Sequence, residues 1–489
     1  MELINQKNKN LFSFQSIKNY QTFLAENPDA CSIAVNHYLS EIEKNKHLNS
    51  FLEIFSDEAL QRAKELDAKR NAGNPLGKLH GVVIALKDVI CYKGHKVSAS
   101  SKILENFTSI YNATAVEKLL AEDAIIIGRN NCDEFAMGSS NENSAFGVVK
   151  NAIDETRVPG GSSGGSAVSV QAGLCMISLG SDTGGSVRQP ADFCGVVGLK
   201  PTYGRISRYG LIAYASSFDQ IGIFANTIDD AALVLETIAG ADDFDSTASR
   251  QKVPSYFSEL KEEKKSYRIA YFKQALEHPG LDKEIAASIQ TYIQTLTDAG
   301  YVVEAIDFDL LNYIVPTYYI LTTAEASSNL SRFDGVKYGY RAALNKDDDL
   351  TELYKKSRSE GFGKEVQRRI LLGTFVLSAG YYDAYFTKAQ QVRRMLSDQT
   401  KKIFEGYDAI ISPTVPTTAF KIGEKSDDPI EMFLADIYTV YANLVGIPGI
   451  SIPLFKHSNG MPFGLQIMTK HFDELSLLSL SKQMMQIKL

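Results

Sequence analysis

The chain has 489 residues, 44% hydrophobic and 22% charged, a composition typical of a globular protein with a large buried core. Its 51 Lys and Arg residues against 58 Asp and Glu residues give a net charge of −7, which argues against a free-standing nucleic-acid-binding protein because phosphate contacts need concentrated positive charge. Five scattered cysteines without a Cys-x-x-Cys pair argue against a disulfide framework and a zinc site, and they predict a reducing compartment.

The N-terminus lacks the basic-then-apolar order of a signal peptide. No apolar run approaches the roughly 18 residues that span a bilayer. The sequence therefore predicts a cytoplasmic protein with no membrane segment.

Helical and strand patterns alternate along the chain. Apolar residues over 35–42 share one helical face, and short apolar runs at 82–86, 125–127 and 177–179 predict buried strands. A second helical stripe over 285–296 stops at Gly300, before a new strand. This alternation predicts an α/β fold in which helices cover a sheet. A polar stretch over 242–266 is either a domain break or a surface loop.

Residues 160–166 read GGSSGGS and run into a predicted helix over 167–172. The glycines let the backbone approach a ligand closely, although the same run also suits a tight turn or a flexible linker. The Gly-Lys-Ser/Thr ending of a P-loop is absent. The run matches the G-x-S-x-G nucleophile elbow, but the histidines that follow Ser162 (His278, His457 and His471) lie in no setting typical of a catalytic loop.

Residues 180–190 read GSDTGGSVRQP and follow a strand-like run. The backbone N–H groups of Thr183, Gly184 and Gly185 can point into one space and form an oxyanion hole, with Ser186 placed to attack the carbonyl held there. A carboxylate- or phosphate-binding nest without chemistry is the alternative.

Lys87 ends an apolar run that begins at residue 82. A lone lysine commonly extends to the surface. If Lys87 is instead buried beside hydroxyls, desolvation lowers its pKa and leaves neutral amine to act as the base that a serine nucleophile needs.

The Lys87 strand, residues 160–166 and 180–190, and residues 193–202 (FCGVVGLKPT) together resemble the amidase signature family. The resemblance implies a single large amidase-signature domain over 61–489 after an N-terminal helical segment over 1–60. Its central mixed β-sheet is covered by helices on both faces, and the core motifs lie within 80–205. It also implies that Ser186 forms an acyl-enzyme while Ser162, preceded by a cis peptide, passes the proton to Lys87.

Further residues follow from the same resemblance. Asp182 and Arg188 match positions that flank the nucleophile and hold the nest. From about Phe51 to Gln483 the chain is similar to the glutamine-hydrolysing subunits of tRNA-dependent amidotransferases, for example at 325–336, 368–375 and 436–449. This implies Asp436 against the α-ammonium of glutamine and Arg369 against its α-carboxylate, where a bidentate fork suits. Either Tyr318 or Tyr319 is expected to line the pocket.

The implied reaction releases ammonia, which a B subunit uses with ATP and Mg²⁺ to convert Glu-tRNA(Gln) to Gln-tRNA(Gln), while a C subunit joins the two. We expect no cofactor and no metal in this chain, and tRNA mainly on the B subunit. Two alternatives stay open. One is a stand-alone amidase acting on a small or aryl amide, and the other is a non-catalytic scaffold, against which the intact Lys87, Ser162 and Ser186 set argues.

Overall fold

The computed structural model describes residues 12–260, 266–425 and 435–487. Within these residues, eleven strands form one sheet in the order β1-β3-β2-β4-β6-β5-β10-β11-β9-β7-β8. Their bounds are β1 Phe51–Ile54, β2 Val83–Lys87, β3 Ile125–Asn130, β4 Ile177–Asp182, β5 Val197–Lys200, β6 Gln220–Ala225, β7 Arg268–Phe272, β8 Val302–Ile306, β9 Ala409–Pro413, β10 Gly449–Lys456 and β11 Pro462–Thr469.

The sheet is mixed, as predicted. Strand β2 is parallel to β3 and β4, and β7 is parallel to β8 and β9. The strands between these groups pair antiparallel, among them β5 with β10 and β10 with β11. Every residue of β2, β3 and β4 is buried, which agrees with the continuous apolar runs that predicted these strands.

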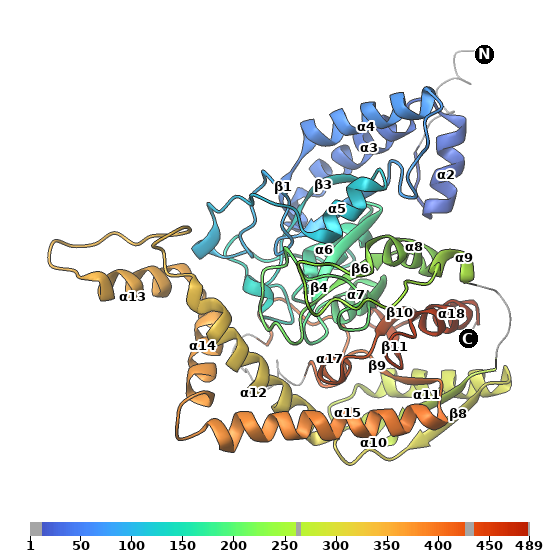
Figure 1. Cartoon of the computed structure of the whole chain (residues 1–489). Coiled ribbons are helices and arrows are strands. Elements are labelled where there is room, and N and C mark those ends of the chain that lie inside the picture. Colours follow the sequence, from blue (N-terminus) through green and yellow to red (C-terminus); the bar gives the residue numbers. More distant parts are fainter. Residues whose placement is uncertain (1–11, 261–265, 426–434, 488–489) are drawn as a thin grey trace.

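Helices lie on both sides of the sheet (Figure 1). The longer ones are α2 Ile17–Glu26, α3 Ala30–Lys44, α4 Ser56–Asn71, α5 Thr114–Ala121, α6 Gly164–Gln171, α7 Arg188–Cys194, α8 Ile228–Ile238, α11 Lys283–Asp298, α12 Leu311–Asn329, α13 Leu350–Gly361, α14 Lys364–Val376, α15 Lys388–Gly406, α17 Val440–Val445 and α18 Glu474–Gln486. The shorter ones are α9 Tyr256–Glu259, α10 Lys273–Leu276, the 3₁₀ turns η1 Lys46–Leu48, η2 Lys102–Leu104, η3 Glu134–Ala136 and η4 Leu330–Arg332, and the π-turn η5 Asp383–Thr387.

Two predicted helices show how sequence determines burial. On α3, Val35, Tyr38 and Ile42 point into the core, and on α11 the predicted stripe contributes Ile285, Ile289, Tyr292 and Leu296. Gly300 follows α11 with a φ of 94°, a backbone conformation that glycine adopts at little cost at a helix end.

The N-terminal segment over 1–60 contains α2 and α3, and also β1, which pairs with β3. The polar stretch 242–266 lies between α8 and β7 and contains α9; its residues 261–265 lie outside the described residues. Strand β7, which follows this stretch, belongs to the same sheet as the strands before it. In the described part of the chain, no helix is long and apolar enough to cross a membrane.

Candidate active site

Lys87 is fully buried at the carboxyl end of β2, so the surface alternative for this lysine is wrong. Its Nζ atom lies 2.7 Å from Ser162 Oγ, 2.8 Å from Ser163 Oγ and 2.9 Å from Ser181 Oγ. Ser162 and Ser163 precede α6, and Ser181 lies on β4, which pairs with β2. Of the three hydroxyls, only that of Ser162 was predicted to contact Lys87, although Ser163 and Ser181 stand in the same motifs.

The hydrogen bonds indicate how these hydroxyls share the amine. Ser163 donates its hydroxyl hydrogen to the carbonyl oxygen of Ser181 at 3.0 Å, so it accepts from Lys87. A neutral amine has two N–H groups and one lone pair, and three hydroxyls match that number if two accept and one donates. If Ser162 is the proton relay, as the family resemblance implies, Ser163 and Ser181 receive the two N–H groups and the lone pair is left for the proton of Ser162.

Burial lowers the pKa of Lys87 to about 8, against the opposing effect of Cys132 and of the carboxylates Asp133 and Asp182. Desolvation disfavours the ammonium form because the interior solvates charge poorly. A substantial neutral fraction near neutral pH makes Lys87 chemically suited to act as a base.

Ser186 lies immediately after the glycine pair at 184–185 and is largely buried, with 8% of its surface exposed. Its carbonyl oxygen accepts the N–H of Ser163 at 3.3 Å, so the loop of the predicted nucleophile runs beside the loop of the predicted relay. The peptide bond between Gly161 and Ser162 is cis. In the described structure, no hydrogen bond joins His278, His457 or His471 to Ser162 or Ser186.

The predicted oxyanion donors differ in their hydrogen bonds. Gly185 donates its N–H to Asp182 Oδ1 at 2.9 Å, so a substrate oxygen must share that hydrogen with the carboxylate. No such bond ties the N–H groups of Thr183 and Gly184 to another described residue. Gly185 has a φ of 126°, and a Cβ there would collide with Thr439; the glycine is needed for both reasons.

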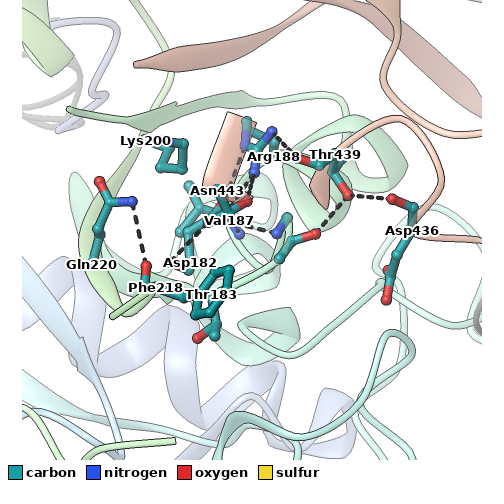
Figure 2. Close-up of polar contacts among 12 residues, drawn as sticks. Asp182, Thr183, Val187, Arg188, Lys200, Phe218, Gln220, Asp436, Thr439 and Asn443 are labelled. Carbon is teal, nitrogen blue, oxygen red and sulfur yellow. Dashed lines mark hydrogen bonds and ion pairs between the residues drawn. The ribbon is translucent and has the colours of Figure 1, made fainter. Parts of the chain in front are cut away.

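Asp182 and Arg188 form a fully buried ion pair of 3.0 Å beneath this loop (Figure 2). Arg188 also donates to Thr439 O at 2.8 Å and to Asn443 Oδ1 at 2.5 Å. Burial alone raises the pKa of a carboxyl group, but Arg188 outweighs it and lowers the pKa of Asp182 to about 2. The ionised Asp182 accepts the N–H groups of Gly185 and Val187 and thereby fixes the loop around Ser186.

Two opposite charges of the predicted glutamine site lie close to the same tyrosine. Asp436 accepts the Tyr319 hydroxyl at 2.9 Å, and the Arg369 guanidinium lies 5.5 Å from the Tyr319 ring centroid. Helix α14 carries Arg369 and packs along α12, which carries Tyr319. The neighbouring Tyr318 packs against Gly184, where an added Cβ would clash with its hydroxyl. Both tyrosines therefore reach the site.

Each of these charged groups is held by partners that the sequence did not reveal. Ser139 donates to both Asp436 oxygens at 2.9 and 3.0 Å, and burial raises the pKa of Asp436 to about 6. Arg369 donates to Glu365 and to the Tyr214 hydroxyl, each at 2.7 Å. Burial opposes the charge of Arg369, but Tyr214 and Glu365 hold its pKa well above the ordinary value.

Comparisons with known proteins identify the family of the chain. A family model described as Amidase matches residues 34–478. The A subunit of glutamyl-tRNA(Gln) amidotransferase from Koribacter versatilis is 53% identical over 449 residues, covering 92% of this chain and 93% of the relative. The protein of the same name from Chlorobium phaeobacteroides strain BS1 is 52% identical over 475 residues, covering 96% and 98%.

Among solved structures, the A subunit of glutamyl-tRNA(Gln) amidotransferase from Thermotoga maritima matches with a TM-score of 0.79 and 37% identity, covering 96% of this chain and 94% of that one. The four segments that carry the resemblance lie inside the range matched by the family model, which also includes all eleven strands of the described sheet. The chain therefore belongs to the amidase family.

Proposed function

We propose that this chain is the glutamine-hydrolysing subunit of a glutamyl-tRNA(Gln) amidotransferase. The observation that carries the proposal is the pair of buried opposite charges, Arg369 and Asp436, which both lie next to Tyr319 in the same structure as the Lys87 serine cluster. Free glutamine presents a carboxylate and an ammonium beside its amide, and a buried pocket must neutralise both because unpaired charges are costly to desolvate. Two relatives that are 53% and 52% identical are A subunits of glutamyl-tRNA(Gln) amidotransferases, which supports the assignment to such an enzyme.

Hydrolysis would proceed in two stages. Ser186 attacks the side-chain amide carbon while its proton passes through Ser162 to the lone pair of Lys87, and the N–H groups of the 183–185 loop stabilise the oxyanion. Lys87, now protonated, returns the proton through Ser162 to the departing nitrogen, so ammonia leaves and a γ-glutamyl ester remains on Ser186. Water then attacks the ester by the same relay and releases glutamate.

The ammonia would serve a B subunit that uses ATP and Mg²⁺ to amidate glutamate on tRNA(Gln), with a C subunit joining this chain to the B subunit in a heterotrimer. The net charge of −7 supports placing tRNA mainly on the partner. A cytoplasmic location is supported by the five cysteines, all of which are buried and unpaired. In this proposal the chain itself binds neither nucleotide nor metal.

Glutamate release tests the proposal. Wild-type protein and Ser186→Ala are compared with glutamine, with and without the B and C subunits, ATP and Glu-tRNA(Gln). We expect release that the partners stimulate, that Ser186→Ala abolishes and that accompanies formation of Gln-tRNA(Gln). Glutamine that stays intact under every condition, while simple aryl amides are cleaved, would contradict the proposal and establish the stand-alone amidase.

A further inference from the structure

One buried side chain connects the glutamine pocket to the proton relay. Gln189 lies on α7, three positions after Ser186, and is fully buried. Its Nε2 donates to the carbonyl oxygen of Ser139 at 2.8 Å, and its Oε1 accepts the N–H of Gly161 at 2.9 Å. Both ends of the amide are therefore engaged by backbone groups of different loops.

Each of those loops carries a group of the proposed reaction. Ser139 holds Asp436 through its hydroxyl, and Gly161 directly precedes Ser162, whose hydroxyl contacts Lys87. The resulting path is continuous, with Gly161 and Ser162 joined by their peptide bond and every other link a hydrogen bond. It runs through Asp436, Ser139, Gln189, Gly161, Ser162 and Lys87.

The chemistry of position 189 is demanding. The bridge needs one donor and one acceptor on the same short planar group, and a primary amide supplies both without charge. A carboxylate lacks the donor, and an aliphatic side chain of similar size lacks both. With an aliphatic side chain, the carbonyl of Ser139 and the N–H of Gly161 would both be unpaired in a buried setting. This favours displacement of one loop from the other.

We propose that Gln189 is a positioning residue that couples the ammonium side of the glutamine pocket to the Ser162 relay. This coupling role rests on the proposed function, because it requires that Asp436 receives the α-ammonium of glutamine. An ammonium bound at Asp436 fixes Ser139, and the Gln189 amide transmits that position to the peptide that orients Ser162. Binding of the ammonium thereby increases turnover as well as affinity.

The test compares glutamine with glutaramate, which has the same side-chain amide and carboxylate but no α-ammonium. In Gln189→Leu, measured in the assembled complex, we expect kcat for glutamine to fall about tenfold or more, and KM for glutamine and kcat for glutaramate to change less than about threefold. The matched control is Gln171→Leu. Gln171 also bridges backbone groups, with Nε2 donating to Cys194 O at 2.9 Å and Oε1 accepting Ala152 N–H at 3.0 Å, but among the described residues no hydrogen bond joins its side chain to the path.

Gln189→Glu supplies a second readout that does not depend on the leucine variant folding. A protonated glutamic acid has one donor and one acceptor and restores the bridge, whereas the carboxylate cannot donate. Position 189 is fully buried, and burial raises the pKa of a carboxyl group above its ordinary value. The ratio of mutant to wild-type kcat on glutamine should therefore rise as the pH falls from about 8 to about 6. Asp133, Asp436 and Lys87 are the described titratable groups on or beside the path, and both proteins contain them. A carboxylate at position 189 would raise the pKa of Lys87, as the nearby acidic groups already do, and this would lower the ratio at low pH. A ratio that rises on acidification therefore reports the restored bridge.

The outcomes separate this inference from the proposed function. A leucine variant that loses equal factors on both substrates, or that changes only KM, overturns the coupling role, as does a glutamate variant whose ratio is constant with pH. Wild-type protein that leaves glutamine intact overturns the proposed function, and the coupling role with it. Wild-type activity on glutamine combined with an unchanged Gln189→Leu overturns the coupling role alone.

Discussion

The rate of glutamine hydrolysis should follow the protonation of Lys87. Burial lowers the pKa of this lysine from 10.5 to about 8, and the surrounding acidic groups limit the shift. Only the neutral amine has a lone pair for the proton of Ser162, so the rate is proportional to the neutral fraction. The active form is present above the pKa and is lost as the pH falls through it.

The expected size follows from the pKa. With a pKa of about 8, roughly one lysine in eleven is neutral at pH 7 and about half are neutral at pH 8. A lysine with the ordinary pKa of 10.5 would be neutral in roughly one molecule in three thousand at pH 7, so burial increases the active fraction about 300-fold. We therefore expect kcat to rise about fivefold from pH 7 to 8 and less than about twofold from pH 8 to 9.

The assay is glutamate release at saturating glutamine by the assembled complex, with overlapping buffers. Lys200 needs a control, because it is also buried and burial lowers its pKa to about 7; Lys200→Met should keep the same rising limb. Lys87→Arg should be inactive throughout, since the guanidinium stays protonated. A flat wild-type profile, a limb centred near pH 10, or a limb that disappears in Lys200→Met would refute the role of Lys87.

Three further predictions concern the pocket and the loop around Ser186. Asp436→Asn should raise KM for glutamine roughly tenfold to a hundredfold, because a charge-assisted hydrogen bond to the α-ammonium is lost. In the wild type, KM should rise as the pH falls through about 6, where Asp436 becomes neutral. A KM that is unchanged in both measurements would contradict this contact. Arg369→Lys should raise KM about tenfold or more because the planar fork is lost, whereas Arg368→Lys, at a neighbouring exposed side chain, should leave KM unchanged. Gly184→Ala should lower kcat at least about tenfold, because the added Cβ would displace Tyr318. Gly380→Ala is the control, since Gly380 has open space around it. Equal kcat values in the two variants would contradict the close packing at Gly184.

Local patterns predicted the elements of the fold well. The apolar runs predicted β2, β3 and β4 because a strand buried on both faces carries few polar residues, and the 3.6-residue stripes predicted α3 and α11. The order of the strands did not follow from such patterns. The pairing of β5 with β10, for instance, joins Leu199 to Ile450, and nothing local in either segment specifies the other.

The residues of the candidate site were likewise predictable from the sequence only in part. Ser162 and Ser186 stand in short glycine-rich motifs and Lys87 ends an apolar run. These residue types indicated a serine nucleophile and a lysine base, and the family resemblance then implied that Ser162 is the relay. The contact of Ser139 with Asp436 could not be predicted, because the two residues are 297 positions apart and a single serine in a loop carries no chemical signal. Gln189 lies within the motif at residues 180–190, but its two backbone partners follow only from the folded arrangement of the loops.

The most direct test of the proposed mechanism is to locate the acyl-enzyme. Wild-type complex is mixed with glutamine, quenched in acid within one turnover and digested. The mass of the peptide that carries Ser186 is then measured by mass spectrometry. We predict a mass increase of one γ-glutamyl group on that peptide, absent in Ser186→Ala and accumulating further in a variant with slowed deacylation. Turnover of glutamine with the glutamyl group on another residue, or with no covalent species under conditions that preserve a serine ester, would contradict the account.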